Sequence, residues 1–332
     1  MPTAPFVRRA RLIAGLTLVA VLSLIPAHAL AQVAGDYRSK ATGNWNATAT
    51  WERFDGTLWV AAVATPTSAD GAITIRSGHV VTISASALSY DQVTVDAGGQ
   101  VTVAAAITHT LANGAGTDLI VNGTWLNLGG TWTVTGATWT VGSGGTYIHS
   151  TTSSISTPIG VATLDAASNF IYRGSSTLTP AVSFANRTYG NLTLESTSGA
   201  WTAAASGTTP LTVNGDFTIG TGVTYSTVQT GIMTFAGNFT NNGTLTNSTG
   251  TQIFTFTGAG KTIGGASSSA FETFNVNTGA SITVNTAASI AATFAGTVDG
   301  TLGVAATLTN SGTLTVNGTL RFDAGGSVSA AP

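Results

Sequence analysis

Short segments with apolar residues at positions i and i+2 recur along the chain, and a Gly or Asn follows many of them. They lie at 192–194, 211–213, 233–235, 254–256, 274–276, Phe294 and 314–316. Their spacing is about 19 to 22 residues. In a β-strand, residues i and i+2 face one side and the Thr between them faces the other. The pattern predicts short strands that bury one face, with Gly and Asn at the corners.

A shorter period explains the longer one. The stretch GTWTVTGATWTVGSGGTY (130–147) repeats every seven residues. A strand of about five residues and a corner of about two make one side, and three sides make about 21 residues. We therefore predict an all-β fold, a single parallel β-solenoid with three sides and about 21 residues per rung, where a rung is one full turn of the chain. Right-handed winding is expected for parallel crossovers, and a β-sandwich array is the alternative fold.

The stretch GNFTNNGTLTN (237–247) is then one part of a rung rather than a binding loop. We expect Phe239 to face the core, residues 241–243 to form a corner and Leu245 to begin the next side. Asn side chains of neighbouring rungs are expected to stack as a hydrogen-bonded ladder.

The N-terminus has the features of an export signal. Three Arg residues precede an apolar run at 12–25, which is short for a membrane span. Residues 29–31 (ALA) fit the rule for signal-peptide cleavage. A signal peptide over 1–31 is therefore predicted, and an uncleaved N-terminal anchor is the alternative.

The segment that follows differs from the repeats. Residues 32–75 contain Trp45, Trp51 and Trp59 and more charge than the rest of the chain. Terminal rungs have an open edge and need a cap. We predict an N-terminal cap over 32–75 with the Trp side chains plugging the first rung, a solenoid over 76–328 and a tail over 329–332. No cap is evident in the sequence after the repeats, which predicts an exposed last rung or a part of a longer repeat protein.

Composition narrows the choice of partners. Charged residues are 7% of the chain and apolar residues 43%, so low charge does not here indicate disorder. Removal of the signal peptide leaves eight basic against 13 acidic residues, a net charge of about −5. This charge disfavours nucleic acid and anionic lipid as partners. The chain has no Cys, which excludes disulfides and thiol chemistry.

Several stretches resemble known secreted proteins. TGNWNATATWERFDG and TIRSGHVVTI resemble the opening of secreted bacterial β-helix proteins, and YGNLTLESTSG, LTVNGDFTIGTG and FAGNFTNNGTLT resemble repeats of adhesin-like or autotransporter-passenger-like surface proteins of Bacteroidetes-type bacteria. The resemblance covers most of residues 41–320. It implies export, a β-helix and an extracellular or outer-surface location, and it implies no catalytic residues. The chain departs from the pattern because its sequence shows neither a translocating barrel nor a sorting domain.

The acidic residues are candidates for catalysis on polysaccharides, which needs clustered carboxylates. Two pairs are spaced about one rung apart and could be neighbours: Asp96 with Asp118, and Glu195 with Asp216. Arg173 and Arg187 are the basic residues nearest the same phase. Solvated corner positions are the alternative interpretation, and we predict no catalytic residues.

Metal and cofactor motifs are weak. NGAGTDLIV (113–121) nearly matches a calcium-binding nonapeptide, but that site needs consecutive copies. An ordinary Gly turn capped by Asp118 is therefore expected, and Asp118 is kept as a weak calcium candidate. His79, His109 and His149 have no metal-ligand spacing. No metal and no cofactor are predicted.

Aromatic and Thr residues give two further hypotheses. Trp132 and Trp139 share a face with Val134 and Val141 and are expected in the core, whereas Trp125 is predicted to be exposed, where it could stack on a sugar. Thr-x-Thr pairs are also frequent, and an array of them on one face would indicate ice binding. These pairs are Thr131/Thr133, Thr138/Thr140, Thr244/Thr246, Thr255/Thr257, Thr307/Thr309 and Thr313/Thr315.

The sequence thus predicts an exported, non-enzymatic β-solenoid that acts as a structural or adhesive surface module. A surface glycan or a host or matrix protein is the expected partner, and the mature chain has no expected membrane span. A polysaccharide-active β-helix enzyme, lyase or hydrolase, is the first alternative. An ice-binding solenoid is the second.

Overall fold

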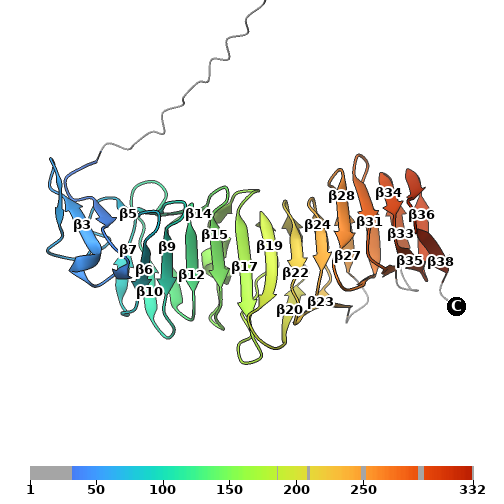
Figure 1. Ribbon diagram of the computed structural model, residues 1–332, viewed down its shortest axis with the longest axis horizontal. Coiled ribbons are helices and arrows are strands. Elements are labelled where there is room, and N and C mark those ends of the chain that lie inside the picture. Colours follow the sequence, from blue (N-terminus) through green and yellow to red (C-terminus); the bar gives the residue numbers. More distant parts are fainter. Residues whose placement is uncertain (1–31, 185, 208–209, 248–251, 291–294, 331–332) are drawn as a thin grey trace, which may run out of the picture. The chain divides into compact units, whose positions relative to one another are not determined.

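Parallel strands stack in register along the chain and form a β-solenoid of about 11 turns with roughly 22 residues per turn. The computed structural model describes residues 32–184, 186–207, 210–247, 252–290 and 295–330. Apart from Gln32, these residues belong to one structural unit, Val33–Pro332. The predicted signal peptide and Phe294 lie outside the described residues. In Figure 1 the labelled strands follow one another in chain order from blue to red. The all-β solenoid is therefore confirmed, while its handedness stays a prediction.

One side of each rung belongs to a single continuous sheet of 13 strands, which we call the long sheet. Its strands are β2 (Gly43–Asn44), β6 (Val80–Ile83), β9 (Gln100–Val103), β12 (Thr124–Asn127), β15 (Thr146–His149), β17 (Asn169–Gly174), β19 (Asn191–Ser196), β22 (Phe217–Ile219), β25 (Phe239–Asn241), β28 (Lys261–Gly264), β31 (Ser281–Val284), β34 (Thr301–Val304) and β37 (Thr319–Phe322).

The second side is divided into two sheets. The eight-stranded sheet has the order β16 (Ala162–Leu164), β14 (Trp139–Val141), β11 (Leu119–Val121), β8 (Val93–Val95), β5 (Ile73–Ile75), β1 (Tyr37–Ser39), β3 (Trp51–Phe54) and β4 (Trp59–Ala61). The seven-stranded sheet has the order β18 (Arg187–Tyr189), β21 (Leu211–Val213), β24 (Ile232–Phe235), β27 (Ile253–Phe256), β30 (Thr273–Val276), β33 (Ala295–Val298) and β36 (Thr313–Val316).

The third side consists of three short sheets. They are β7 (Leu88–Tyr90), β10 (Thr108–Leu111) and β13 (Thr131–Val134); β20 (Trp201–Gly207), β23 (Val223–Gln229) and β26 (Thr244–Asn247); and β29 (Ser269–Phe271), β32 (Ala288–Ile290), β35 (Thr307–Asn310) and β38 (Ser327–Ala330). The described helices are a 3-10 turn, η1 (Thr48–Thr50), and α1 (Ser156–Gly160).

The seven-residue period does mark the three sides. Strands β13, β14 and β15 follow one another in the sequence and lie in three different sheets. The longer series needs one correction, because residues 192–194 belong to β19 of the long sheet, whereas 211–213, 233–235, 254–256, 274–276 and 314–316 lie in the seven-stranded sheet. The strand of the seven-stranded sheet that precedes β19 is β18, whose first residue is Arg187. A charged residue there hid this strand from an apolar pattern.

Aromatic rings fill most of the interior. From Tyr37 to Phe274 the rings form a connected series of contacts, among them Tyr37–Trp51 at 6.5 Å, Trp45–Tyr90 at 5.4 Å, Tyr90–Trp125 at 5.8 Å, Trp132–Tyr147 at 6.0 Å, Phe170–Tyr189 at 5.0 Å, Phe217–Phe239 at 5.2 Å and Phe271–Phe274 at 5.4 Å. Beyond Phe274 the buried positions hold smaller residues such as Val284, Leu302 and Leu308. Packing of this kind adds about 0.5–1.5 kcal/mol per aromatic pair beyond area burial.

The N-terminal segment closes the first rung with antiparallel strands. Strand β1 pairs in parallel with β5 and antiparallel with β3, which in turn pairs antiparallel with β4. Trp45 and Trp51 are 1% and 0% exposed and fill the end of the core. Trp59 does not, because it lies outside with the Arg38 guanidinium 4.2 Å from its ring centroid. The expectation that all three Trp residues plug the rung is therefore wrong for Trp59.

At the last described rung, apolar side chains are open to solvent. Val316, Phe322 and Val328 are 38%, 55% and 37% exposed. They continue the columns of Val298, Val304 and Leu308, which are fully buried. Their exposure follows from their place in β36, β37 and β38, the final strands of their sheets.

Asn and Asp side chains tie the corners of successive rungs together. Asn191 Oδ1 accepts the N–H of Asp216 at 2.8 Å, Asp216 Oδ1 accepts that of Asn238 at 2.8 Å, and Asn238 Oδ1 accepts that of Thr262 at 3.0 Å. The expected ladder is thus mainly side chain to backbone. In the 237–247 stretch, Phe239 and Leu245 are buried as predicted. Asn241 is not a corner residue but ends β25, buried, with its Nδ2 donating to the Ser268 carbonyl.

Candidate functional site

The regular three-sided pattern fails in two consecutive rungs, which we call the seam. On the third side, helix α1 replaces a strand in the first of these rungs, and residues 175–184 replace it in the second. On the second side, β16 is the last strand of the eight-stranded sheet and β18 the first of the seven-stranded sheet. On the long sheet the same rungs stay paired over six residues of β17 and β19. The solenoid therefore remains joined along one side and opens along another.

The register shows why the seam opens. Arg187 occupies the column that holds Leu211, Met233, Phe254 and Phe274 in the following rungs. On the other side of the seam, Ala162 follows the buried side chains of Leu119 and Trp139 in the equivalent column. A small residue and a charged residue thus stand where neighbouring rungs place large apolar ones. When large apolar side chains are missing from a core column in two adjacent rungs, the interior can contain a cavity at that place.

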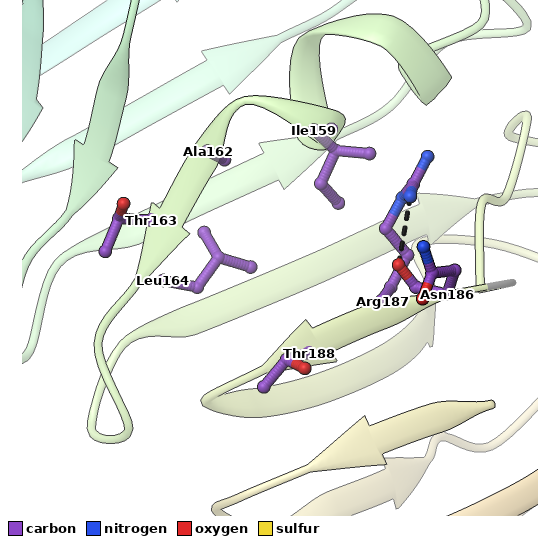
Figure 2. Close-up of a pocket in the computed structure, with 8 residues that line it drawn as sticks. Ile159, Ala162, Thr163, Leu164, Asn186, Arg187 and Thr188 are labelled. Carbon is purple, nitrogen blue, oxygen red and sulfur yellow. Dashed lines mark hydrogen bonds between the residues drawn. The ribbon is translucent and has the colours of Figure 1, made fainter.

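A cavity of about 380 Å³ lies at this place, and we call it the seam cleft. One wall of the cleft is formed by Ile159, Gly160, Ala162, Thr163 and Leu164. The opposite wall is formed by Asn186, Arg187 and Thr188. Figure 2 shows Ile159 and Leu164 on the α1–β16 side, facing Asn186, Arg187 and Thr188 of the β18 side. The volume is at the lower end of the range of about 300–1,000 Å³ for small-ligand sites.

Arg187 carries the only charge among the residues that line the cleft. Its Nη1 donates to the Asn186 carbonyl at 3.0 Å and its Nη2 to the Ser156 carbonyl at 2.9 Å. Its Nε is buried and has no hydrogen-bond partner in the described part of the chain. The ion pairs found among the described residues are Arg38–Glu52, Arg173–Glu195 and Arg321–Asp323. A partly buried guanidinium without a paired acid suits an anionic ligand.

The neighbourhood of Arg187 is held in place by buried polar contacts. Trp139 Nε1 donates to the Pro158 carbonyl of α1 at 2.7 Å, which fixes the helix over the core. Behind β18, the Tyr172 and Tyr189 hydroxyls are 3.0 Å apart. Burial raises the pKa of Tyr172 to about 12, and the positive charge of Arg187 acts in the opposite direction. The cleft thus has a fixed wall rather than a loose one.

The two acid pairs whose spacing allowed them to be neighbours are not brought together. Val93 pairs with Leu119, so Asp118 lies before β11 and Asp96 lies after β8, at opposite ends of neighbouring strands. Leu192 pairs with Phe217, which places Asp216 beside Asn191 and not beside Glu195. Glu195 instead forms an ion pair with Arg173 of the preceding rung. These acids are not neighbours because the rungs at both places are longer than the mean repeat.

Asp118, the weak calcium candidate, is fully buried and holds a turn. Its Oδ1 accepts the N–H of Gly114 at 2.5 Å and its Oδ2 that of Thr138 at 2.7 Å. Asp91 lies nearby, and burial, together with the negative charges of Asp118 and Asp70, raises the pKa of the Asp91 carboxyl. In the described ranges, no three metal-binding side chains come together. The arrangement supports a structural role for Asp118.

We expect Asp118→Ala to lower the free energy of unfolding by about 1–3 kcal/mol, because two partly buried hydrogen bonds from the N–H groups of Gly114 and Thr138 to a charged acceptor are lost. Added calcium should leave the unfolding midpoint of the parent chain unchanged. Urea unfolding with calcium and with a chelator measures both effects. Asp165→Ala is the matched control, since Asp165 is exposed and its carboxylate accepts one N–H, from Ala167. Stabilisation by calcium that disappears in Asp118→Ala would instead assign a metal site.

The three candidate His residues lie apart. His79 Nδ1 is 2.8 Å from the Ser39 hydroxyl. His109 is buried between aromatic rings, stacked on Tyr90 at 5.9 Å and on Trp132 at 5.7 Å, with its Nδ1 2.8 Å from the Tyr90 hydroxyl. His149 ends β15 in the core beside Tyr147 and Tyr172. His109 and His149 therefore pack as aromatic residues of the core.

Trp125 is not an exposed sugar platform. It is 0% exposed and stacks on Trp132 at 5.7 Å with an interplanar angle of 11°. The prediction was wrong because β12 turns Trp125 and Asn127 inward, whereas Leu128 is 43% exposed. The core positions predicted for Trp132 and Trp139 are confirmed.

The Thr-x-Thr pairs are distributed over different sheets. Thr131/Thr133 lie on β13, Thr140 on β14, Thr244/Thr246 on β26, Thr255 on β27, Thr307/Thr309 on β35 and Thr313/Thr315 on β36. Thr188, Thr212, Thr234 and Thr255 do form a register-matched column, but Asn275 interrupts it. This column is one residue wide and does not build the two-residue array that the ice-binding hypothesis needs.

Comparison with known proteins gives no relative: no family model, no curated protein and no solved structure matches the chain. A search for membrane-spanning helices in the described ranges found no candidate. The seam cleft is therefore assigned from geometry alone. Sequence reasoning named Arg187 only as a partner for acids, although an Arg at a strand position that otherwise holds Leu, Met or Phe was a usable signal.

Proposed function

We propose that this chain is an exported, non-catalytic β-solenoid that serves as a structural and adhesive module at a bacterial surface. In this proposal residues 1–31 direct export, and the long sheet holds the rungs as a stiff frame. The observation that carries the proposal is the seam cleft, a cavity lined by one cation that has no paired acid among the described residues. Its lining contains no carboxylate and no imidazole, the groups that general acid–base cleavage of polysaccharides uses.

The acids outside the cleft support the same proposal because their oxygens connect rungs. Glu195 is paired with Arg173, Asp216 accepts the backbone N–H and the Nδ2 of Asn238, and Asp118 accepts two backbone N–H groups. Removal of such groups would loosen the stack. A surface glycan and a host or matrix protein are the partner classes we propose for adhesion.

The test measures adhesion and catalysis on the same protein. Beads that carry residues 32–332 are offered to bacterial cells and to immobilised matrix proteins and glycans, and the soluble protein is incubated with polysaccharides. We expect Arg187-dependent retention and no new reducing ends or unsaturated products. Arg187→Gln should reduce retention, whereas Lys40→Gln, which removes one exposed positive charge, should not. Product formation above the buffer rate would favour the enzyme alternative.

A further inference from the structure

We propose that the seam cleft binds an extended peptide segment that carries an acidic side chain and that this segment adds as a strand between β16 and β18. The inference rests on the proposed adhesive function, because it names the ligand class of that module. It follows from three properties of the cleft. These are free strand edges, a core column with Ala162 and Arg187 in place of large apolar residues, and a cation without a paired acid.

The first property is the pair of free edges. Strand β16 bonds to β14 on one side only, and β18 to β21 on one side only. Within the described ranges, no strand pairs with either of the two edges that border the seam. Extended peptides bind such edges through main-chain hydrogen bonds, with pockets for alternate side chains giving specificity. A peptide strand here would bond to one or both of these edges.

The second property is the register, which fixes the peptide pattern. Ala162 and Arg187 lie in the first inward column, Leu164 and Tyr189 in the second, and Thr163 and Thr188 face outward. A strand placed between them turns one side chain toward Arg187 and the next but one toward Leu164 and Tyr189. The expected pattern is therefore acidic, polar, apolar, with small polar residues on the outside.

The third property is the charge. The Arg187 guanidinium is anchored by the Asn186 and Ser156 carbonyls, which leaves Nε free to donate. A carboxylate beside it would supply the acceptor that the described residues do not. Ala162, which lies opposite, leaves space for this side chain. In the preceding rung the same column position holds the larger side chain of Trp139. Charge-assisted bonds of this kind are about twice as strong as neutral ones.

Binding of a defined peptide to residues 32–332 tests the proposal. The probe is the fluorescently labelled, acetylated and amidated peptide Thr-Glu-Thr-Val-Thr, measured by fluorescence anisotropy. We expect saturable binding that weakens at least about tenfold when Gln replaces Glu, since a charge-assisted hydrogen bond is lost. N-methylation of the central Thr should weaken it similarly, because a ladder hydrogen bond is removed.

Variants on both walls of the cleft complete the test. Arg187→Gln should abolish the preference for Glu over Gln, and Ala162→Leu should block the cleft with a side chain that the same column carries at Leu119. Lys40→Gln should bind like the parent chain. Circular dichroism and the unfolding midpoint of each variant report whether it folds. If Arg187→Gln does not fold, Ala162→Leu still tests the proposal. Loss of peptide binding in that variant with an unchanged unfolding midpoint supports the site.

Other outcomes overturn the inference. Absence of saturable binding, or equal affinity for the Glu and Gln peptides, excludes the acidic peptide. Tolerance of N-methylation excludes strand addition. Arg187-dependent binding of oligogalacturonate without peptide binding assigns the cleft to an acidic glycan. In that case the adhesive function stands and only its ligand changes, whereas loss of bead adhesion with intact peptide binding would overturn the function and keep the site.

Discussion

Acidification from pH 7 to pH 4 should destabilise the folded chain strongly, because His109 and His149 are buried in neutral form. Burial lowers the pKa of His109 from 6.5 to about 4. Burial also lowers the pKa of His149 to about 4, and the backbone of Ser153 acts in the opposite direction. Below pH 6.5 both His side chains bind a proton in the unfolded chain, whereas in the folded chain they stay neutral until about pH 4. Each His therefore removes about 3 kcal/mol of stability over that interval.

Two carboxyl groups act against this trend. Burial raises the pKa of Asp91 and of Asp96, with Arg76 opposing the shift at Asp96. Their ionisation destabilises the folded chain near neutral pH, so acidification relieves that cost. The histidine effect should nevertheless dominate between pH 6 and pH 4, because His109 and His149 are 0% and 1% exposed and both shift far.

Urea unfolding of residues 32–332 at several pH values between 7 and 4 measures the effect. His149→Phe should remove about half of the pH dependence, because Phe keeps a ring against Tyr147 and Tyr172 without a titrating group. Tyr225→Phe is the matched control and should leave the slope unchanged, since burial raises the pKa of the Tyr225 hydroxyl and no group that titrates between pH 4 and pH 7 is removed. An unfolding midpoint that is flat from pH 7 to pH 4 in the parent chain would contradict buried neutral imidazoles.

The solenoid could be predicted because its rule is repeated in every rung. Apolar residues at i and i+2 with Thr between them reappear in β21, β24 and β27, and β30 keeps the apolar pair with Asn275 between them, so each copy reinforces the same assignment. Single positions were less secure. Asn241 resembles a corner residue by type, yet it ends β25 because its amide finds the Ser268 carbonyl in the interior.

The seam and its cleft could not be predicted from the repeat, because the repeat averages over rungs. The rungs between β8 and β11 and between β19 and β22 are longer than the mean, so side chains one mean period apart lie at opposite strand ends. Arg187 and Ala162 depart from the pattern, and such departures are where functional or strained sites are expected. Whether these two residues border a cavity depends on which strands lie beside them, and the strand register in the folded structure is needed to know that.

Truncation of Trp125 should strongly destabilise the N-terminal half of the core. Trp125 is fully buried and packs against Tyr90 at 5.8 Å and Trp132 at 5.7 Å. Trp125→Ala should therefore lower the free energy of unfolding by about 3–5 kcal/mol, through lost transfer energy and the cavity left behind. Because each rung contacts only its neighbours, the loss should appear first in the amides of β9, β12 and β15 by hydrogen exchange.

The same substitution at Trp59 separates burial from residue type. Trp59 is partly exposed and packs on Phe54 at 5.4 Å and under the Arg38 guanidinium at 4.2 Å. Trp59→Ala should cost about 1 kcal/mol, the range of an exposed cation–π and aromatic contact. Urea unfolding of both variants gives the comparison. Equal, small losses would mean that the Trp125 indole lies at the surface, which would restore it as a glycan platform and remove the main anchor of the aromatic core between Tyr90 and Tyr147.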